Sequence, residues 1–342
     1  MTSPTSPSDG LADDPVARWL NWVRPRLSAF FQPPAAPADP ASMSDVQLHH
    51  AIFVVSNRLL YFVGQWVMKC YDGRPVNDER FKWAMPTTVH AHVQLGFTSA
   101  SDSAWLAAKG LELSASAAAL GPIRDVAETL ARLSWLLQPA DDQARLGRAY
   151  GFMQHDIDQE FQLVGAVKKS SNRLGKTPDQ VWDRYSSNSG RKRDRLAEIA
   201  AEDGVAIEKL PQTSDLFELY LHDMGGYPLF SALSKAASHP GCSRPFVFYA
   251  DPTKGMALDF DFQKMHAKRA FWLSKSQQLY IALSQLVGPE LDWPADWEDV
   301  LNGLAKQLKP LADEADRRVM TPLTATFESF TDTAPNPGAS DR

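Results

Sequence analysis

The chain has 342 residues, of which 44% are hydrophobic and 22% are charged, and this composition excludes a disordered or fibrous protein. Its formal net charge of -6 excludes a protein whose whole surface is built for nucleic acid, and leaves room only for a local basic patch. Its two cysteines, Cys70 and Cys242, lie far apart and outside any metal-ligand spacing, which excludes a disulfide framework and fits a reducing compartment.

The N-terminal residues 1–14 are rich in Ser, Pro, Gly and Asp, and we expect them to be disordered. They have no basic stretch followed by an apolar core, so they do not form a secretion signal. The most apolar stretch, 51–68, is interrupted by Asn57, Arg58 and Gln65, which a spanning helix would bury in hydrocarbon. The sequence therefore predicts a buried helix there, no membrane span and a cytoplasmic protein.

Residues 15–31 have the apolar spacing of an amphipathic helix, with a kink at Pro25. Such a helix either contacts a membrane surface or a partner, or folds back onto its own domain. The Pro- and Ala-rich residues 32–42 are predicted to form an extended linker.

A single helical domain is predicted over 43–330, followed by a disordered tail over 331–342. Within it, Ser101 and Asp102 are typical of an N-cap, and Gly121 with Pro122 is typical of one helix ending where the next begins. The segment "SSNSG" (186–190) is predicted to be a loop.

The fold class is all-α, with short breaks between long helices that favour an antiparallel multi-helix bundle. Residues 245–261 are β-rich around a turn and form either a small β-hairpin or an irregular loop. Basic residues accumulate between Lys168 and Arg195, and they form either a solvated surface or a phosphate-binding segment.

Several motifs with a known mechanism are absent from the sequence. It has no G-x-S-x-G, no G-x-x-x-x-G-K-[ST], no G-x-G-x-x-G after a strand, no H-E-x-x-H and no Glu-x-x-His pair. Nucleotide hydrolases and the common metalloenzymes are therefore disfavoured. The sequence predicts no metal and no cofactor, and it leaves open whether the protein is an enzyme.

Three polar groupings remain as candidates. Arg124, Glu128 and Arg132 follow one another at four-residue steps, so they share a helix face. They either point into a polar pocket that has Trp135 as its wall, or form a solvated row of ion pairs. The spacing of these three residues does not decide between the two interpretations.

A second grouping is the pair Arg148 and His155, which lie two helical turns apart on one face. Some ribonucleases of the HEPN type carry an arginine and a histidine at a similar, shorter spacing. The alternative is a partly buried polar helix face. Both residues are candidate binding residues.

The third grouping lies in "GGYPLFSALSKAASHPG" (225–241), where Ser231, Lys235 and His239 recur at helical spacing. A histidine near a helix C-terminus is stabilised as the cation, so His239 could act as an acid or base or hold a phosphate. The alternative is that His239 only caps the last carbonyl groups of the helix.

Taken together, "IRDVAETLARLSWLLQP" and "YPLFSALSKAASHPG" resemble segments of uncharacterised, all-helical bacterial proteins of actinobacterial type, which are distantly similar to HEPN domains. The resemblance implies that Arg124, Glu128 and His239 converge on one polar pocket, with Ser231 and Ser234 as binding residues. It suggests RNA as the partner and phosphodiester binding or cleavage as the function. In that function Arg124 would hold phosphate and His239 would act as acid or base. The alternative is a non-catalytic protein that contacts another protein through 15–31.

Overall fold

The computed structural model describes residues 39–72, 78–81, 86–113, 116–174, 179–238, 262–294 and 296–332. The chain divides into two compact units, 1–43 and 44–342. The predicted disordered segment 1–14, the amphipathic helix 15–31, the β-rich segment 245–261 and residues 333–342 lie outside the described residues.

The described end of the first unit is a single 3-10 turn, η1 (Pro40–Ser42). The Asp39 side chain accepts a hydrogen bond from the backbone N–H of Ala41 at 3.1 Å. These residues were predicted as part of an extended linker, but a capping aspartate followed by proline at the first helical position favours a turn instead.

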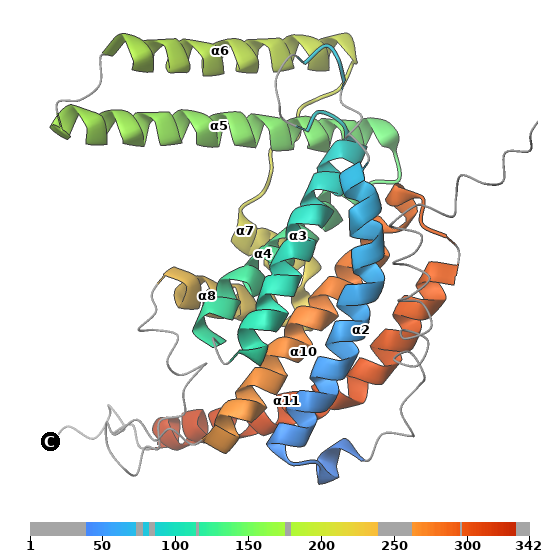
Figure 1. Ribbon diagram of the computed structural model, residues 1–342. Helices are drawn as coiled ribbons and strands as arrows, with labels where there is room; N and C mark the ends of the chain where they lie inside the picture. The colour runs from blue at the N-terminus through green and yellow to red at the C-terminus, as the bar shows by residue number, and fades with distance from the viewer. Residues whose placement is uncertain are drawn as a thin grey trace, which may run out of the picture. The chain divides into compact units, whose positions relative to one another are not determined.

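The second unit is built from helices. They are α2 (Asp45–Asp72), α3 (Val89–Glu112), α4 (Ser116–Leu137), α5 (Asp142–Leu174), α6 (Asp179–Glu202), α7 (Thr213–Tyr220), α8 (Gly226–Ser238), α10 (Phe262–Val287) and α11 (Asp296–Asp332), with the 3-10 turns η2 (His222–Met224) and η4 (Pro289–Leu291) (Figure 1). No strand occurs among the residues that the structure describes, and the prediction of an all-α protein is confirmed.

Helix α10 packs against α2, α3, α4 and α11, so side chains on several of its faces are enclosed (Figure 1). Leu273 and Leu283 are fully buried, and Tyr280 is buried with its hydroxyl donating a hydrogen bond to Ser101 Oγ on α3 at 2.9 Å. Lys275 pairs with Asp316 on α11 at 2.6 Å. The helix therefore links its neighbours through both apolar packing and polar contacts.

The predicted helix boundaries around Ser101 and Pro122 are wrong. Helix α3 continues through Ser101 to Glu112, and Pro122 lies inside α4. Ser101 Oγ donates to the carbonyl of Phe97 at 2.7 Å, which is the contact by which serine is accommodated within a helix. Local capping signals are overridden here because Ser101 is buried against the other helices.

The loop predicted at 186–190 is also wrong, because these residues belong to α6. Ser189 is 1% exposed, and the following residues Leu196 and Ile199 pack with Tyr150 and Met153 of α5. Packing against α5 therefore holds in helical form a segment whose composition alone favours a loop.

Residues Asp45–Met68 of α2 are, within the described part of the chain, the one segment long and apolar enough to cross a membrane. One such helix is weak evidence, because the core helix of a soluble protein passes the same test. Leu48, Ile52 and Leu59 are fully buried against other helices, and Arg58, which the sequence singled out, is also buried. The segment therefore has the packing of a core helix.

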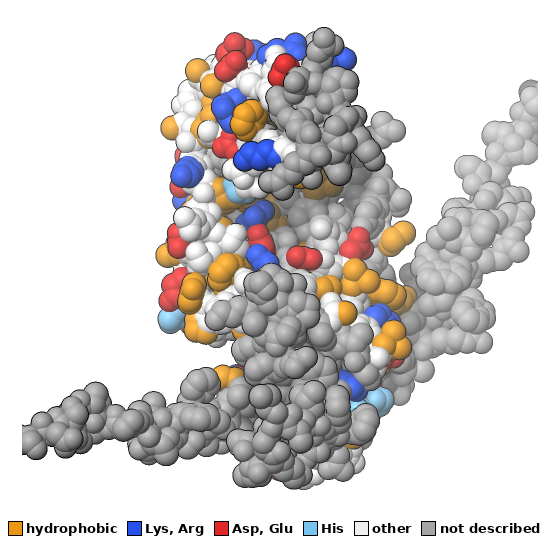
Figure 2. Space-filling model, turned by 90° about the vertical axis from the view of Figure 1, so that its left-hand side faces the viewer, with side chains coloured by type: hydrophobic (Ala, Val, Ile, Leu, Met, Phe, Trp, Pro, Cys, Tyr) orange, Lys and Arg blue, Asp and Glu red, His pale blue; other side chains and the backbone are white. Residues whose placement is uncertain are grey.

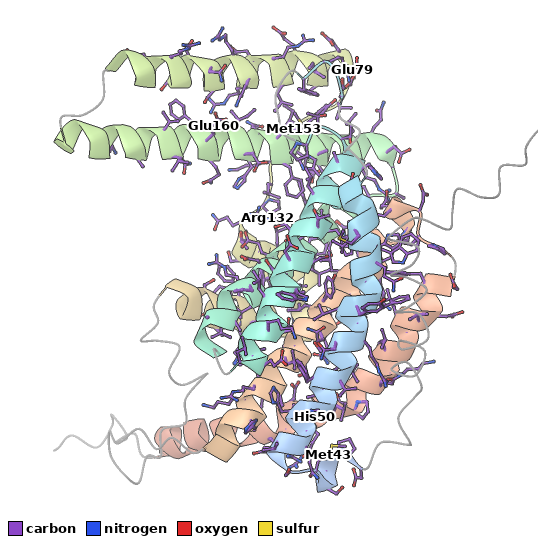
Figure 3. The ribbon with its side chains drawn as sticks, viewed as in Figure 1. Met43, His50, Glu79, Arg132, Met153 and Glu160 are labelled. Atoms are coloured by element: carbon purple, nitrogen blue, oxygen red, sulfur yellow. The ribbon has the colours of Figure 1, made fainter. Side chains whose placement is uncertain are left out.

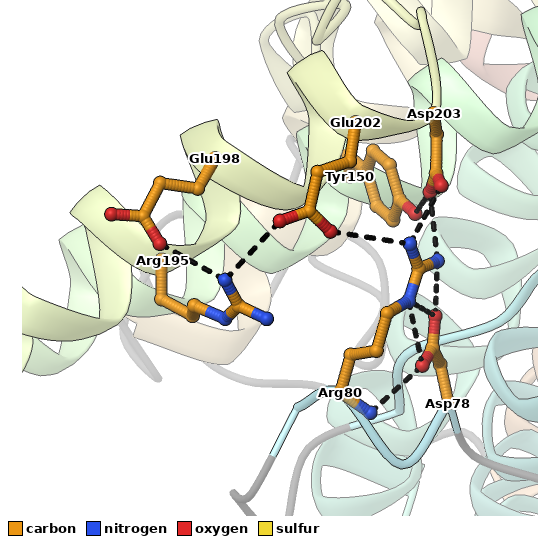
Figure 4. A network of polar contacts seen from close by, with 7 residues as sticks. All are labelled: Asp78, Arg80, Tyr150, Arg195, Glu198, Glu202 and Asp203. Carbon is orange, nitrogen blue, oxygen red and sulfur yellow. Dashed lines mark hydrogen bonds and ion pairs between the residues drawn. The ribbon is translucent and has the colours of Figure 1, made fainter.

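A polar network holds the segment 78–81 against α5 and the end of α6 (Figure 4). Arg80 binds both carboxylate oxygens of Asp203, at 2.6 and 2.8 Å, and also binds Asp78. Tyr150 donates its hydroxyl to Asp203. The hydrogen bonds from Arg80 and Tyr150 hold the pKa of Asp203 below its ordinary value, so the network is charged at neutral pH.

Two glycines of α5 allow the backbone of 205–208 to cross the helix in direct contact. A Cβ atom at Gly147 would lie 2.5 Å from the carbonyl oxygen of Ala206, and one at Gly151 would lie 1.8 Å from that of Glu208. The backbone N–H of Glu208 donates to the carbonyl of Gly147 at 3.1 Å. Only glycine leaves room for this contact.

We expect Gly151→Ala to lower the free energy of unfolding by about 1–3 kcal/mol or more, because the backbone at Glu208 would have to move. Gly165→Ala in the same helix is the matched control, since nothing lies within 4 Å of its Cβ position. The control should be neutral or stabilising by up to about 1 kcal/mol. Urea unfolding measures both, and equal effects of the two substitutions would contradict the close crossing.

His92 of α3 lies between α3 and α5 with its ring stacked on Phe152, at 5.2 Å between ring centroids. It is 8% exposed, and its Nε2 atom is buried without a hydrogen-bond partner. Burial lowers the pKa of His92 from 6.5 to about 4. The folded protein therefore holds a neutral imidazole over a pH range in which the unfolded chain is protonated.

This depressed pKa makes folding stability depend on pH. Above about pH 6.5 the full stability is present, and as the pH falls toward 4 the unfolded state takes up a proton that the folded state does not. The contribution of His92 to that loss is about 1.4 kcal/mol per pH unit. We expect His92→Gln to flatten the dependence by this amount in urea unfolding between pH 4 and 6.5. An unchanged slope would show that His92 is not the group responsible.

Candidate functional site

The charged row of α4 lies where this helix packs against α7 and α8. The side chains of Arg124, Glu128 and Arg132 are 31%, 21% and 30% exposed, so the row is neither buried nor freely solvated. The row is therefore a set of ion pairs that other helices partly enclose. It has features of both interpretations of the sequence, the polar pocket and the solvated row. Figure 3 labels Arg132 in the region between α5 and α7.

Glu128 is held mainly by one of its two arginines. Its Oε1 atom lies 2.7 Å from Nη2 of Arg132 and accepts a hydrogen bond from the hydroxyl of Thr213, the first residue of α7, at 3.4 Å. The distance from its Oε2 atom to Nε of Arg124 is longer, 3.8 Å. The carboxylate of Glu128 is thus bound mainly by Arg132 and Thr213.

Arg124 consequently has unused hydrogen-bonding capacity. Its Nε atom is buried without a hydrogen-bond partner, and its guanidinium donates no hydrogen bond to any residue that the structure describes. The guanidinium carbon lies 5.9 Å from the ring centroid of Phe230 on α8, so a cation–π contact orients it. A guanidinium held in this way can still donate to an anion.

Helix α8 brings the predicted serines toward α4. Ser231 follows Phe230 in the chain, and Ser234 lies one turn beyond Phe230 on the same face, with its hydroxyl buried. His239 directly follows the last residue of α8, Ser238, and lies outside the described residues. The structure therefore brings together Arg124, Glu128 and α8, and the contact with His239 stays a prediction.

Trp135 and Arg148 contact each other instead of lining the space around Glu128. Trp135 is 3% exposed, and the guanidinium carbon of Arg148 lies 5.0 Å from its ring centroid. Arg148 also donates to Glu208 at 2.9 Å, to Gln138 at 3.2 Å and to the backbone carbonyl of Trp135. All of these contacts join α4 to α5 and to the segment after α6, so both residues have a structural role.

His155 lies on α5 near the Arg132 end of the row. Burial raises the pKa of its neighbour Asp156, and the charges of His155 and Arg132 act on the same carboxyl in the opposite direction. Sequence reasoning missed three residues beside the charged row. Thr213 donates to Glu128, Phe230 contacts Arg124, and the carboxyl of Asp156 is influenced by the charge of Arg132. Thr213 and Phe230 come from α7 and α8, whose contact with α4 no local pattern indicates.

The basic segment before Arg195 is neutralised in part by ion pairs among the side chains that the structure describes. Lys192 pairs with Glu160 at 2.7 Å, and Arg193 pairs with Asp158 at 2.5 Å, so α6 is joined to α5. Arg195 pairs with Glu198 on its own helix at 3.0 Å. At these three positions the ion pairs favour the interpretation as a solvated surface over that of a phosphate-binding segment.

Among the described residues, no group of three or more His, Cys, Asp or Glu side chains could hold a metal ion. Comparison with protein families, with curated proteins and with solved structures finds no match to this chain. The candidate site is therefore defined by the contacts of Arg124, Glu128 and Arg132 with α7 and α8.

The contacts of Arg148 predict a stability effect. Arg148→Met should lower the free energy of unfolding by about 1–3 kcal/mol, because it removes charge-assisted hydrogen bonds and a cation–π contact. Arg193→Met is the control, since its ion pair is exposed and should contribute less than about 1 kcal/mol. Urea unfolding compares the two. A loss no larger for Arg148→Met than for the control would rule out the structural role.

Proposed function

We propose that this chain binds the phosphate groups of RNA at the α4 row, with Arg124 as the residue that contacts phosphate. The observation that carries the proposal is that Arg124 is partly exposed and makes no hydrogen bond to the described residues, while Glu128 is committed to Arg132 and Thr213. Guanidinium groups bind phosphate through several N–H donors at once, which makes this the expected ligand.

The distribution of charge supports a local phosphate-binding site rather than an extended basic surface. On the face shown in Figure 2, Lys and Arg side chains are interspersed with Asp and Glu. On α6, Lys192 and Arg193 are paired with carboxylates of α5. With a net charge of -6, attraction of RNA would depend on a few unneutralised arginines.

The proposal extends to phosphodiester cleavage, with His239 as acid or base. It is supported by the position of His239 directly after α8, the helix whose Phe230 contacts Arg124. A relation to HEPN domains, a cytoplasmic location and an antiparallel bundle as scaffold are parts of the same proposal. The side-by-side packing of α3 with α4 and of α10 with α11 supports the last of these.

Binding is tested with labelled single-stranded RNA at several salt concentrations. Arg124→Ala should weaken binding about tenfold or more, because a hydrogen bond to a charged group contributes about 1.5–3 kcal/mol. It should also reduce the slope of log K against log salt by about one unit. Arg193→Ala, which removes the same charge from an exposed ion pair on α6, is the control. Equal losses in both variants would show a non-specific charge effect and contradict the proposal.

Cleavage is followed with the same RNA in the unaltered chain and in His239→Ala and Arg124→Ala. Loss of cleavage in His239→Ala with binding retained supports the role of His239 in proton transfer. Undiminished cleavage in both variants would exclude the catalytic assignment, whatever the outcome of the binding experiment.

A further inference from the structure

A buried arginine without a partner lies near the start of α10. Only 6% of Arg269 is exposed, and its Nε atom is buried without a hydrogen-bond partner. No described residue forms an ion pair or a hydrogen bond with its guanidinium. Arginine stays charged at neutral pH even when burial lowers its pKa, as it does here. Removing such a charge from water is costly unless an opposite charge compensates it.

Two imidazoles lie near Arg269, because His266 precedes it by three residues on α10 and His49 of α2 contacts His266. Nδ1 of His49 on α2 lies 3.4 Å from Nδ1 of His266 on α10. Burial lowers the pKa of both rings, and the charge of Arg269 lowers it further. The Nε2 atom of His49 is buried without a hydrogen-bond partner. Figure 3 labels His50, the neighbour of His49, toward the N-terminal end of α2, the helix that packs against α10. Three groups that can carry positive charge are therefore gathered in one place.

The two carboxylates whose charges act on these imidazoles already have cationic partners. Glu112 of α3 acts on His49 and pairs with Lys109 at 2.7 Å. Asp45 of α2 acts on His266 and pairs with Arg318 of α11 at 2.7 Å. Within the described parts of the chain, no carboxylate remains to compensate Arg269.

We propose that Arg269, His49 and His266 form a binding site for a phosphate group between the N-terminal halves of α2 and α10. The guanidinium of Arg269 provides the charge, and the imidazoles of His266 on the same helix and of His49 on α2 provide further hydrogen-bonding groups. One arginine can bind both oxygens of a carboxylate by itself. Polar groups from three side chains on two helices suit instead an anion with more oxygens. This site is separate from the α4 row and does not rest on its proposed function.

The first test is thermal unfolding of the full chain at pH 7 in sodium phosphate and in sodium chloride of equal ionic strength. Phosphate should raise Tm with the logarithm of its concentration once this exceeds Kd, by roughly 5 °C at 100 times Kd. Arg269→Gln should lose most of this rise, and Arg193→Ala, which alters an exposed ion pair outside both proposed sites, should keep it. No rise in the unaltered chain, or an equal rise in Arg269→Gln, would overturn the proposal.

The second test does not depend on the folding of a variant. Imidazole nitrogen resonances of His49 and His266 in the unaltered chain are followed by NMR during titration with inorganic phosphate, with Arg124→Ala as the control for the α4 row. Saturable shifts of both rings that persist in Arg124→Ala support the site, and unchanged resonances overturn it. Failure of RNA binding alone leaves this result unaffected, so the two proposals can fail independently.

A parallel titration with a nucleoside monophosphate distinguishes the source of the phosphate. Shifts of His49 and His266 that saturate at a lower concentration than with inorganic phosphate would identify a phosphate monoester as the ligand. The opposite order would identify the free ion.

Discussion

The enclosure of α10 by α2, α3, α4 and α11 is the constraint on which the rest of the described structure depends. A helix covered on several sides can satisfy its polar side chains only through groups on its neighbours. The hydroxyl of Tyr280 donates a hydrogen bond to Ser101 on α3, and Lys275 forms an ion pair with Asp316 on α11. Gln277 is fully buried with no partner for its amide among the described residues, and Arg269 is in the same position. Several buried polar groups without a described partner therefore lie on α10.

The arginines of this chain differ in what surrounds them, and that difference separates structural from functional candidates. The guanidinium of Arg148 donates hydrogen bonds to Glu208 and Gln138 and makes a cation–π contact with the ring of Trp135. Arg80 is likewise bound to Asp78 and Asp203. Arg124 and Arg269 have donors left over, one at a partly exposed helix junction and one in the core. Since a buried donor without a partner is costly, these two positions favour a ligand.

The sequence predicted the fold class well and the helix boundaries poorly, for the same reason. Apolar residues at helical spacing identify helices because burial of one face stabilises them. Capping and turn signals contribute only about 1 kcal/mol each, and packing overrides them. Ser101 and Ser189 are examples: both read as breaks, and both are buried inside continuous helices.

For the candidate site, spacing along one helix was enough to place Arg124, Glu128 and Arg132 on one face, because four residues nearly complete a turn. The sequence by itself thus determined the all-α class and this charged row. Only the tertiary structure decided that α7 and α8 cover the row, that Trp135 and Arg148 contact each other, and that His49 of α2 contacts His266 of α10. These contacts join residues from separate helices, and their geometry comes from how the helices pack, which no local pattern specifies.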